Sequence, residues 1–279
     1  MRMLWKDETV PALRLNVTAV TLSGPRGGND DRYVMGTKND LRFARAKSQM
    51  QVCGGVPFLA AVADGVSSTP EKGEIAQFAV ERLGKLFQQG ADPHTWLQDV
   101  NRAASSLYLD PEKSIPTPSG ATTLSLLAFM GRRVIAANVG DSPILRIRGE
   151  EMMPMYLPHN QYAQESLQRE CDQWQDGGAL TNFIGNPYYS KSKEFFMEEL
   201  VQPGDIYVVC SDGAAQAVTW RRLLDCLHTR KKTTADQLLH HYADPLRDDS
   251  TLILIRVLPA ANGLPGIFQP VRLVKKIML

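Results

Sequence analysis

The sequence predicts an α+β fold in which a central antiparallel β-sandwich is flanked by helix pairs on both outer faces, giving four layers, αββα. Apolar segments with strand periodicity come in clusters separated by short turns rich in Gly and Pro, which is typical of antiparallel strands. Segments with helical periodicity come in pairs between these clusters. They do not alternate singly with strands, as they would in a doubly wound parallel sheet.

The first half of the chain predicts two strands followed by two helices. Residues 16–23 alternate Val and Leu with Thr and stop at a Gly-Pro pair, as a half-buried strand does. Residues 57–63 form a short apolar run between two glycine-containing turns, which indicates a buried strand. Apolar residues then recur at helical spacing over 71–88 and, less regularly, over 93–109.

The second half repeats this plan of strands followed by helices. We expect a meander of three strands at 122–130, 133–139 and 144–148. A further strand at 205–210, two helices at 220–228 and 234–242, and a final strand at 251–257 follow.

The irregular sequence at 152–189 predicts a flap, and the residues from about 259 predict a short C-terminal extension. The basic stretch of this extension is interpreted as a surface segment, with an extra strand or a docking tail as alternatives. Without an internal repeat or an obvious linker, 1–279 is expected to be a single domain.

Composition excludes several classes of function. The net charge of +1 provides no bulk field that would attract nucleic acid or an anionic membrane. The four cysteines form no close pair, which argues against a zinc ribbon or a dithiol redox motif. Apolar runs are too short to span a bilayer, and charges near the N-terminus argue against a signal peptide. We therefore expect a cytoplasmic protein that neither inserts into membranes nor binds nucleic acid.

Aspartates mark the ends or beginnings of predicted strands. Asp64, Asp141, Asp212 and Asp248 share this position, and an Asp-Asp pair follows the first strand. Taken singly, an Asp beside Gly is more often a turn former than a ligand. Several carboxylates in one cleft repel each other unless cations neutralise them, and oxygen ligands favour Mg or Mn. Two such ions about 4 Å apart can activate a water for attack on a phosphoryl group.

Six short motifs, in this order along the chain, resemble those of the metal-dependent serine/threonine phosphatases of bacterial type, also called type 2C protein phosphatases. They are RGGNDDR at 26–32, VADG at 62–65, SGATT at 119–123, ANVGDS at 137–142, VCSDG at 209–213 and RDDST at 247–251. The resemblance thus extends over most of the sequence.

The resemblance implies a dinuclear site for Mn or Mg. Asp64 would bridge both cations, and the carbonyl oxygen of Gly65 would be a further ligand to one of them. Asp212 and Asp248 would complete the coordination of the other cation. Asp64 is accordingly the first catalytic candidate.

The resemblance also implies roles around these ligands. Asp30 and Asp31 would hold metal-bound waters, and Asp141 would help to bind a third, weaker cation. Arg26 would bind the substrate phosphate with its planar guanidinium, and is the second catalytic candidate.

Four positions depart from the family pattern. Asp30 stands where Glu is usual, so its carboxylate reaches about one methylene less far. Val66 offers no proton for the leaving group. Asp249 replaces an Asn, which adds negative charge that is expected to tighten metal binding or to recruit an extra ion. Pro143 replaces an Arg.

The expected function is the metal-dependent hydrolysis of phosphoserine and phosphothreonine on proteins by a monomer that works opposite a cognate Ser/Thr kinase. One alternative is a weak or inactive relative that binds phosphoproteins as a scaffold, and another is a phosphatase for small metabolites. His159, His228, His240 and His241 are interpreted as surface or helix-end residues, and Cys210 as a core residue.

Overall fold

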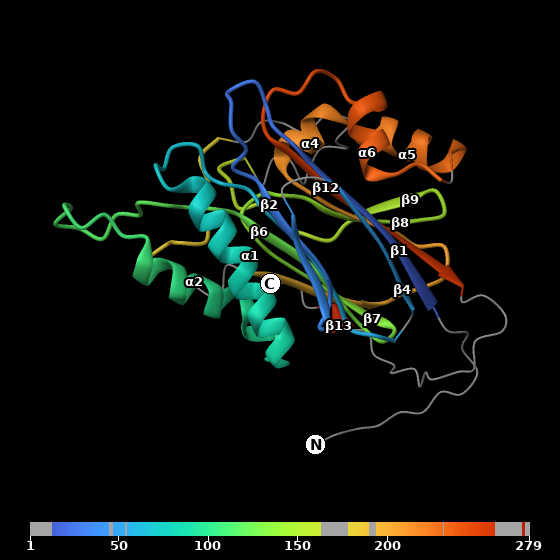
Figure 1. Ribbon diagram of the computed structural model, residues 1–279, viewed down its shortest axis with the longest axis horizontal. Coiled ribbons are helices and arrows are strands. Elements are labelled where there is room, and N and C mark those ends of the chain that lie inside the picture. Colours follow the sequence, from blue (N-terminus) through green and yellow to red (C-terminus); the bar gives the residue numbers. More distant parts are fainter. Residues whose placement is uncertain are drawn as a thin grey trace.

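A computed structural model describes residues 13–44, 47–53, 55–162, 178–189, 194–230, 232–259 and 275–276. Two antiparallel sheets pack face to face, and helices cover the outer face of each (Figure 1). The predicted α+β sandwich is therefore confirmed. In the part of the chain described, no helix is both long enough and apolar enough to cross a bilayer.

One sheet has six strands in the order β4-β1-β12-β11-β8-β9. Its strands are β1 (Leu13–Leu22), β4 (Ser48–Cys53), β8 (Ile144–Arg148), β9 (Glu151–Pro154), β11 (Ile206–Cys210) and β12 (Ser250–Pro259). β1 and β12 pair along their whole length, from Leu13 opposite Pro259 to Leu22 opposite Ser250. The earliest and one of the latest strands thus lie side by side at the centre of the sheet.

The other sheet has seven strands in the order β13-β10-β7-β6-β5-β2-β3. They are β2 (Arg32–Thr37), β3 (Asp40–Ala44), β5 (Phe58–Ala63), β6 (Leu124–Met130), β7 (Arg133–Val139), β10 (Phe195–Leu200) and β13 (Lys275–Lys276). Every residue of β5 is buried, because this strand has the other sheet on one face and helices on the other.

Each sheet carries its own set of helices. α1 (Lys72–Gln89), the 3₁₀ turn η1 (Pro93–Thr95) and α2 (Trp96–Leu107) cover the seven-stranded sheet. α4 (Asp212–Ala217), α5 (Trp220–Thr229), α6 (Ala235–Gln237) and the π-helical turn η3 (Leu238–Tyr242) cover the six-stranded sheet. The helices therefore flank the sandwich on both sides, as Figure 1 shows.

Apolar burial holds these layers together. Between the sheets, the Phe129 ring of β6 meets the Tyr207 ring of β11 edge to face, with centroids 5.3 Å apart. Cys210 belongs to the same core, as predicted. On the helical side, Ile75 and Leu83 of α1 pack on the outer face of β5 and its neighbours. The apolar stripe of α1 thus fixes the start of this helix relative to the end of β5.

The predicted three-strand meander is wrong at its last step. β6 and β7 pair as expected, but β8 pairs with β9 and β11 in the opposite sheet. The chain crosses between the sheets at Gly140, whose φ of +99° is accessible to glycine. The turn after β7 is therefore a passage from one sheet to the other.

Some elements differ from prediction or lie outside the described residues. β2, β3, β4, β10 and α4 were not predicted. The predicted flap begins with strand β9, and 163–177 lie outside the described residues. Of the predicted C-terminal extension, Lys275–Lys276 pair with β10 as the short strand β13, one of the alternatives above; residues 260–274 and 277–279 are not described.

Candidate active site

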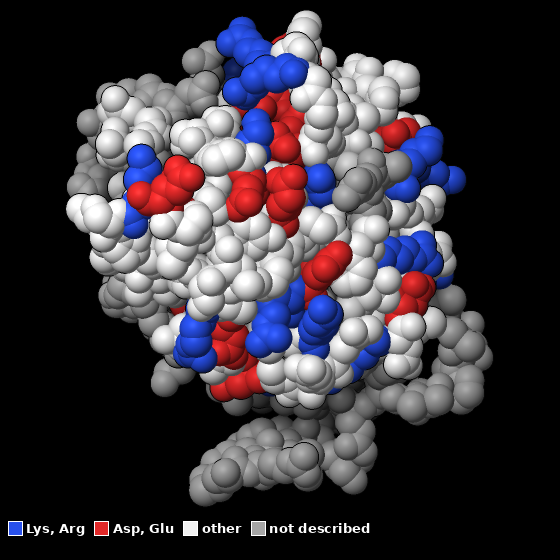
Figure 2. All heavy atoms as spheres, turned by 60° about the vertical axis from the view of Figure 1, so that its left-hand side comes forward, with Lys and Arg blue, Asp and Glu red and all other residues white. Residues whose placement is uncertain are grey.

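A cavity of about 710 Å³ opens at the end of the sandwich where β5, β7 and β11 finish and β6 and β12 begin. Acidic side chains gather on this face of the molecule (Figure 2). Six carboxylates and two cationic side chains line the cavity: Asp30, Asp64, Asp141, Asp212, Asp248 and Asp249, with Arg26 and Lys72. The aspartates predicted from scattered turns therefore meet in space, with the exception of Asp31, which does not line the cavity.

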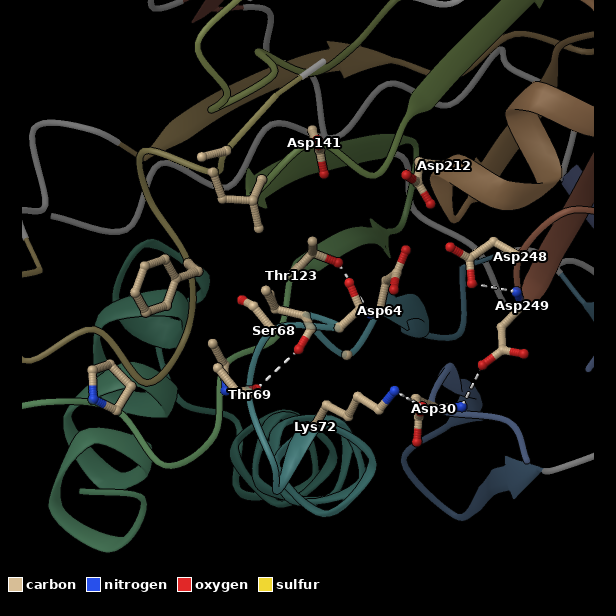
Figure 3. A pocket seen from close by; sticks show the side chains of 18 of the residues that line it. Asp30, Asp64, Ser68, Thr69, Lys72, Thr123, Asp141, Asp212, Asp248 and Asp249 are labelled. Carbon is tan, nitrogen blue, oxygen red and sulfur yellow. Dashed lines mark hydrogen bonds and ion pairs between the residues drawn. The ribbon is translucent and has the colours of Figure 1, made fainter. Parts of the chain in front are cut away.

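Asp64 follows directly after β5 and is held by the start of β6. Its backbone N–H donates to Thr123 Oγ1 at 3.0 Å, and its carbonyl oxygen accepts from the Thr122 hydroxyl at 2.8 Å. The Asp64 side chain points into the centre of the cavity (Figure 3). Two consecutive threonines thus set the direction of this carboxylate.

The Asp141 turn is joined to the same threonine pair. Thr123 Oγ1 lies 2.7 Å from Ser142 Oγ, and the Ser125 hydroxyl donates to the Ser142 carbonyl oxygen at 2.6 Å. Asn160 Nδ2 donates to Asp141 Oδ2 at 3.1 Å. A chain of hydroxyl groups therefore fixes the turns of Asp64 and Asp141 relative to each other.

His159 also supports this turn, so its interpretation as a surface residue is wrong. The imidazole is buried, and its Nδ1 accepts a hydrogen bond of 3.0 Å from the Gly140 N–H. Because the Gly140 N–H donates to it, Nδ1 carries no proton in this arrangement. His159 thus acts on the site through the backbone of the Asp141 turn.

Asp212 and Asp248 come from the other sheet. The N–H of Ser211 donates to the Thr251 carbonyl oxygen at 3.0 Å, and the Thr251 N–H donates back to Ser211 Oγ at 2.9 Å. A Cβ on Gly213 would lie 2.1 Å from the carbonyl oxygen of Asp249, so the two turns pack backbone against backbone. This close approach brings the two aspartates to the same wall.

Asp249 has a structural role that the sequence did not indicate. Its Oδ1 accepts from the Gly24 N–H at 2.8 Å and its Oδ2 from the Asp30 N–H at 2.7 Å. Both oxygens are thus used to close the loop between β1 and β2. Asp249 also lines the cavity, and the expectation that its negative charge tightens metal binding or recruits an extra ion stays a prediction.

Two ion pairs flank Asp64. The guanidinium of Arg26, whose side chain is 58% exposed, pairs with Asp248 Oδ2. On another side of Asp64, Lys72 Nζ lies 2.9 Å from Asp30 Oδ2. Asp248, a candidate metal ligand, therefore already contacts a cationic side chain, and so does Asp30, a candidate water-holding residue.

Asp31 is buried beneath the cavity, with 1% of its surface exposed. Among the described residues, neither of its carboxylate oxygens has a hydrogen-bond partner of good geometry. Burial raises the pKa of Asp31 to about 7, although the hydroxyls of Ser211 and Thr251 lie close enough to oppose the rise. The ionised carboxylate of such a residue is stabilised when a cation or a bound water lies next to it.

Asp64 has the same electrostatic difficulty. Burial raises its pKa well above the ordinary value, and the carboxylates of Asp31 and Asp212 raise it further. Divalent cations would remove this penalty, and the oxygen-only donor set suits Mg or Mn. The donor set therefore fits the expected metals. However, no three Asp, Glu, His or Cys side chains in the described ranges stand ready in a coordination geometry.

Sequence reasoning identified the acidic residues but missed the groups that position them. Thr123, His159, Asn160 and Lys72 were not assigned to the site, and each acts through a partner distant in the sequence or on another element. The SGATT segment at 119–123 carried a signal, because two adjacent hydroxyl residues at the start of a buried strand need local partners. Nothing in the sequence indicated Lys72.

The chain matches the family model described as protein phosphatase 2C over residues 45–249. It is 23% identical over 192 residues to Protein phosphatase 2C 56 of Arabidopsis thaliana. This alignment covers 62% of this chain and 43% of that protein. The chain therefore spans less than half the length of this curated relative.

Solved structures of similar fold include the S. agalactiae serine/threonine phosphatase, with a TM-score of 0.67, 19% identity and coverage of 87% of this chain and 99% of that chain. The catalytic domain of the serine/threonine phosphatase PstP, in complex with two manganese ions, matches with a TM-score of 0.65 and 18% identity over 88% of this chain and 99% of that chain. Because the family model covers most of the sequence and the fold agrees, the chain belongs to the protein phosphatase 2C family.

Proposed function

We propose that this protein hydrolyses phosphoserine and phosphothreonine on proteins, using two divalent cations held by Asp64, Gly65, Asp212 and Asp248. The observation that carries the proposal is the convergence of these residues from both sheets on one cavity, with Arg26 at its rim. The raised pKa of Asp64 supports a site built to be neutralised by cations. Asp141 would contribute to a third, weaker position.

The residues of the chain divide the work of binding and orientation. Cations held by the carboxylates would neutralise the phosphate and make a water nucleophilic. Arg26, half of whose side chain is exposed, can turn its guanidinium towards two phosphate oxygens. As the water oxygen bonds to phosphorus and the bond to the Ser or Thr oxygen breaks, that oxygen takes up a proton. Val66 lines the cavity and cannot provide the proton, so solvent supplies it.

The decisive test is turnover of a phosphothreonine peptide and of an aryl phosphate with and without Mn. We expect activity with Mn, none with a chelator, and a loss of at least about a thousandfold in Asp64→Ala. Asp244→Ala is the matched control, because Asp244 is exposed and its side chain pairs, within the part of the chain described, only with Arg222 of α5. Turnover that persists in Asp64→Ala would contradict the proposal.

The same assay separates the alternatives. Binding of a phosphopeptide without turnover would indicate a scaffold. Faster turnover of sugar or nucleotide phosphates than of phosphopeptides would indicate a metabolite phosphatase. We favour a protein substrate because the cavity is lined partly by two partly exposed loops, at 117–118 and 178–183. A Ser/Thr kinase acting on the same substrate, a monomeric state and a cytoplasmic location remain parts of the proposal.

The second of these loops lies in the predicted flap. Gly178, Leu180 and Phe183 line the cavity, and Ile184 pairs with Thr122 beside Asp64. We propose that this segment selects substrates. Exchanging it for another sequence should change the preference among phosphopeptides while aryl phosphate turnover is kept, and unchanged preference would reject its role.

A further inference from the structure

Lys72 is a cation inside the cavity that neither the motifs nor the family match assigns. It is the first residue of α1, and its side chain runs along the cavity wall towards Asp30 (Figure 3). The ammonium contacts Asp30 Oδ2 at 2.9 Å, and about a third of the side chain remains exposed. The group is therefore both fixed and accessible from the cavity.

The position of Lys72 is set by the backbone on both sides of it. A Cβ on Gly65 would lie 2.6 Å from the Lys72 carbonyl oxygen, and a Cβ on Gly73 would lie 2.8 Å from Asp30 Oδ1. These two glycines let the start of α1 approach the Asp64 turn and the Asp30 loop. Lys72 is thus held between a candidate metal ligand and a candidate water-holding carboxylate.

An ammonium has three N–H donors, and within the described residues the ammonium of Lys72 pairs with Asp30 alone. Two donors therefore remain for a ligand without breaking the contact to Asp30. Of the described residues that line the cavity, only Arg26 and Lys72 carry positive side chains. Arg26 lies beside Asp248, whereas Lys72 lies on another side of Asp64, so the two can approach a central anion from different directions.

We propose that Lys72 is a second phosphate-binding residue, which contacts the substrate phosphate together with Arg26 while it keeps Asp30 in place. This proposal rests on the proposed phosphatase function. A doubly charged phosphomonoester can accept a further positive contact beside Arg26 and the proposed cations. Lys72 supplies it on the wall where Asp30, shorter than the usual Glu, leaves room.

Phosphate affinity provides the test, because it needs no turnover. Binding of inorganic phosphate to the Mn-loaded protein is measured by calorimetry for wild type, Lys72→Met, Lys72→Gln and Lys72→Arg. Lys85→Met is the matched control, since Lys85 lies on the same helix and is exposed. We expect about tenfold weaker phosphate binding for Lys72→Met and Lys72→Gln. Lys72→Arg and Lys85→Met should stay within about twofold of wild type.

Mn affinity separates phosphate binding from a purely structural role. If Lys72 only held Asp30, its loss would weaken Mn binding, and the Gln variant, which can still donate to Asp30, would behave like wild type. Under the proposal, Mn binds at least as tightly to Lys72→Met, because a neighbouring positive charge has been removed. With an aryl phosphate, KM should rise about tenfold while kcat changes little.

Two outcomes would overturn the assignment: unchanged phosphate affinity in both neutral variants, or no phosphate binding by the wild-type protein. Failure of the proposed function would look different. In that case phosphate binding would still depend on Lys72, but wild-type protein would hydrolyse no phosphopeptide. Thermal unfolding of each variant confirms that the protein is folded before affinities are compared.

Discussion

At the scale of single residues, the candidate site depends on side chains that bind groups distant in the sequence, up to 225 positions away. Asp249 closes the loop between β1 and β2 with both carboxylate oxygens. Thr123 holds the backbone N–H of Asp64 and the hydroxyl of Ser142 at once. Neither side chain has to contact a substrate to matter, because each one fixes the direction of a candidate catalytic aspartate or of its loop.

Asp249→Asn tests the loop closure. An amide has one acceptor oxygen, so its NH₂ group would face the N–H of Gly24 or Asp30, and a partly buried donor would lose its partner. We expect the free energy of unfolding to fall by about 1–3 kcal/mol in urea titration. Asp244→Asn, at an exposed ion pair, should change it by less than about 0.5 kcal/mol. Equal effects of the two substitutions would refute the role given to Asp249.

Thr123→Val tests the hydroxyl chain. The shape is kept, but the Asp64 N–H and the Ser142 hydroxyl lose their shared partner. We expect a stability loss of about 1–3 kcal/mol and a clear fall in kcat for aryl phosphate, because the Asp64 turn is no longer fixed. Thr229→Val removes an exposed hydroxyl from α5 and serves as the control. Wild-type kcat in Thr123→Val would show that the threonine does not orient Asp64.

These residues also show how far the sequence could predict the site. Asp64, Asp141, Asp212 and Asp248 were found because each stands at a strand end and in a motif with ordered spacing. The partners of Asp249 and Lys72 could not be found, since a contact such as that from Gly24 to Asp249 depends on the pairing of β1 with β12, two strands far apart in the sequence. Local sequence holds no information about a neighbour 225 positions away.

At the scale of elements, prediction succeeded where apolar periodicity was strong and failed where it was diluted. β5 and α1 were predicted almost to the residue. β2 was missed because Gly36 and Thr37 end a short apolar run, and β4 because three polar residues alternate with its apolar ones. α4 was missed because Asp212-Gly213 reads as a turn, whereas Asp212 is the first residue of a short helix.

The Gly140 turn takes the chain from one sheet to the other and also places Asp141 in the candidate site. A Cβ at this position would lie 2.6 Å from the Thr123 side chain, and φ is +99°. Gly140→Ala should therefore lower the free energy of unfolding by more than about 2 kcal/mol. Activity should fall as well, because the Asp141 turn must move.

Gly131→Ala is the control for that substitution. Gly131 also has positive φ, but nothing lies within 4 Å of its would-be Cβ, so only the backbone conformation is strained. We expect a loss of about 1 kcal/mol with kcat unchanged. Each variant is measured by urea unfolding and by aryl phosphate turnover. Similar losses of stability and of kcat in the two alanine variants would contradict the steric explanation.

At the scale of the whole molecule, the cavity is assembled by both halves of the sandwich. Asp64 comes from the seven-stranded sheet, and Asp212 and Asp248 from the six-stranded one. Their mutual repulsion acts directly against the packing of the sheets unless cations or protons compensate it. The free energy of unfolding should therefore depend on the concentration of divalent cations and on pH.

The sign of the pH effect follows from the raised pKa of Asp31. In the metal-free protein the folded pKa, about 7, lies above the ordinary value of 3.8. The folded state therefore binds more protons between these values, and stability is lost as pH rises towards 7. Lowering the pH from 7.5 to 5.5 with a chelator present should recover on the order of 2 kcal/mol in urea titrations.

With saturating Mn the slope should reverse, because protons then compete with the metal for the carboxylates. Asp31→Asn should reduce the slope of the metal-free protein, since one of the two buried titrating carboxylates is gone. A metal-free protein that becomes steadily more stable as pH rises from 5.5 to 7.5 would contradict this account of the buried carboxylate.

The placement of β12 between β1 and β11 has a consequence for biosynthesis. A nascent chain emerging from the ribosome exposes β1 early, but its principal partner is translated only after all the helices of the sandwich. Until then the six-stranded sheet lacks its middle strand, and Asp248 does not exist beside Asp64. The proposed centre therefore cannot assemble until β12 has been made, and translation itself would delay the proposed activity.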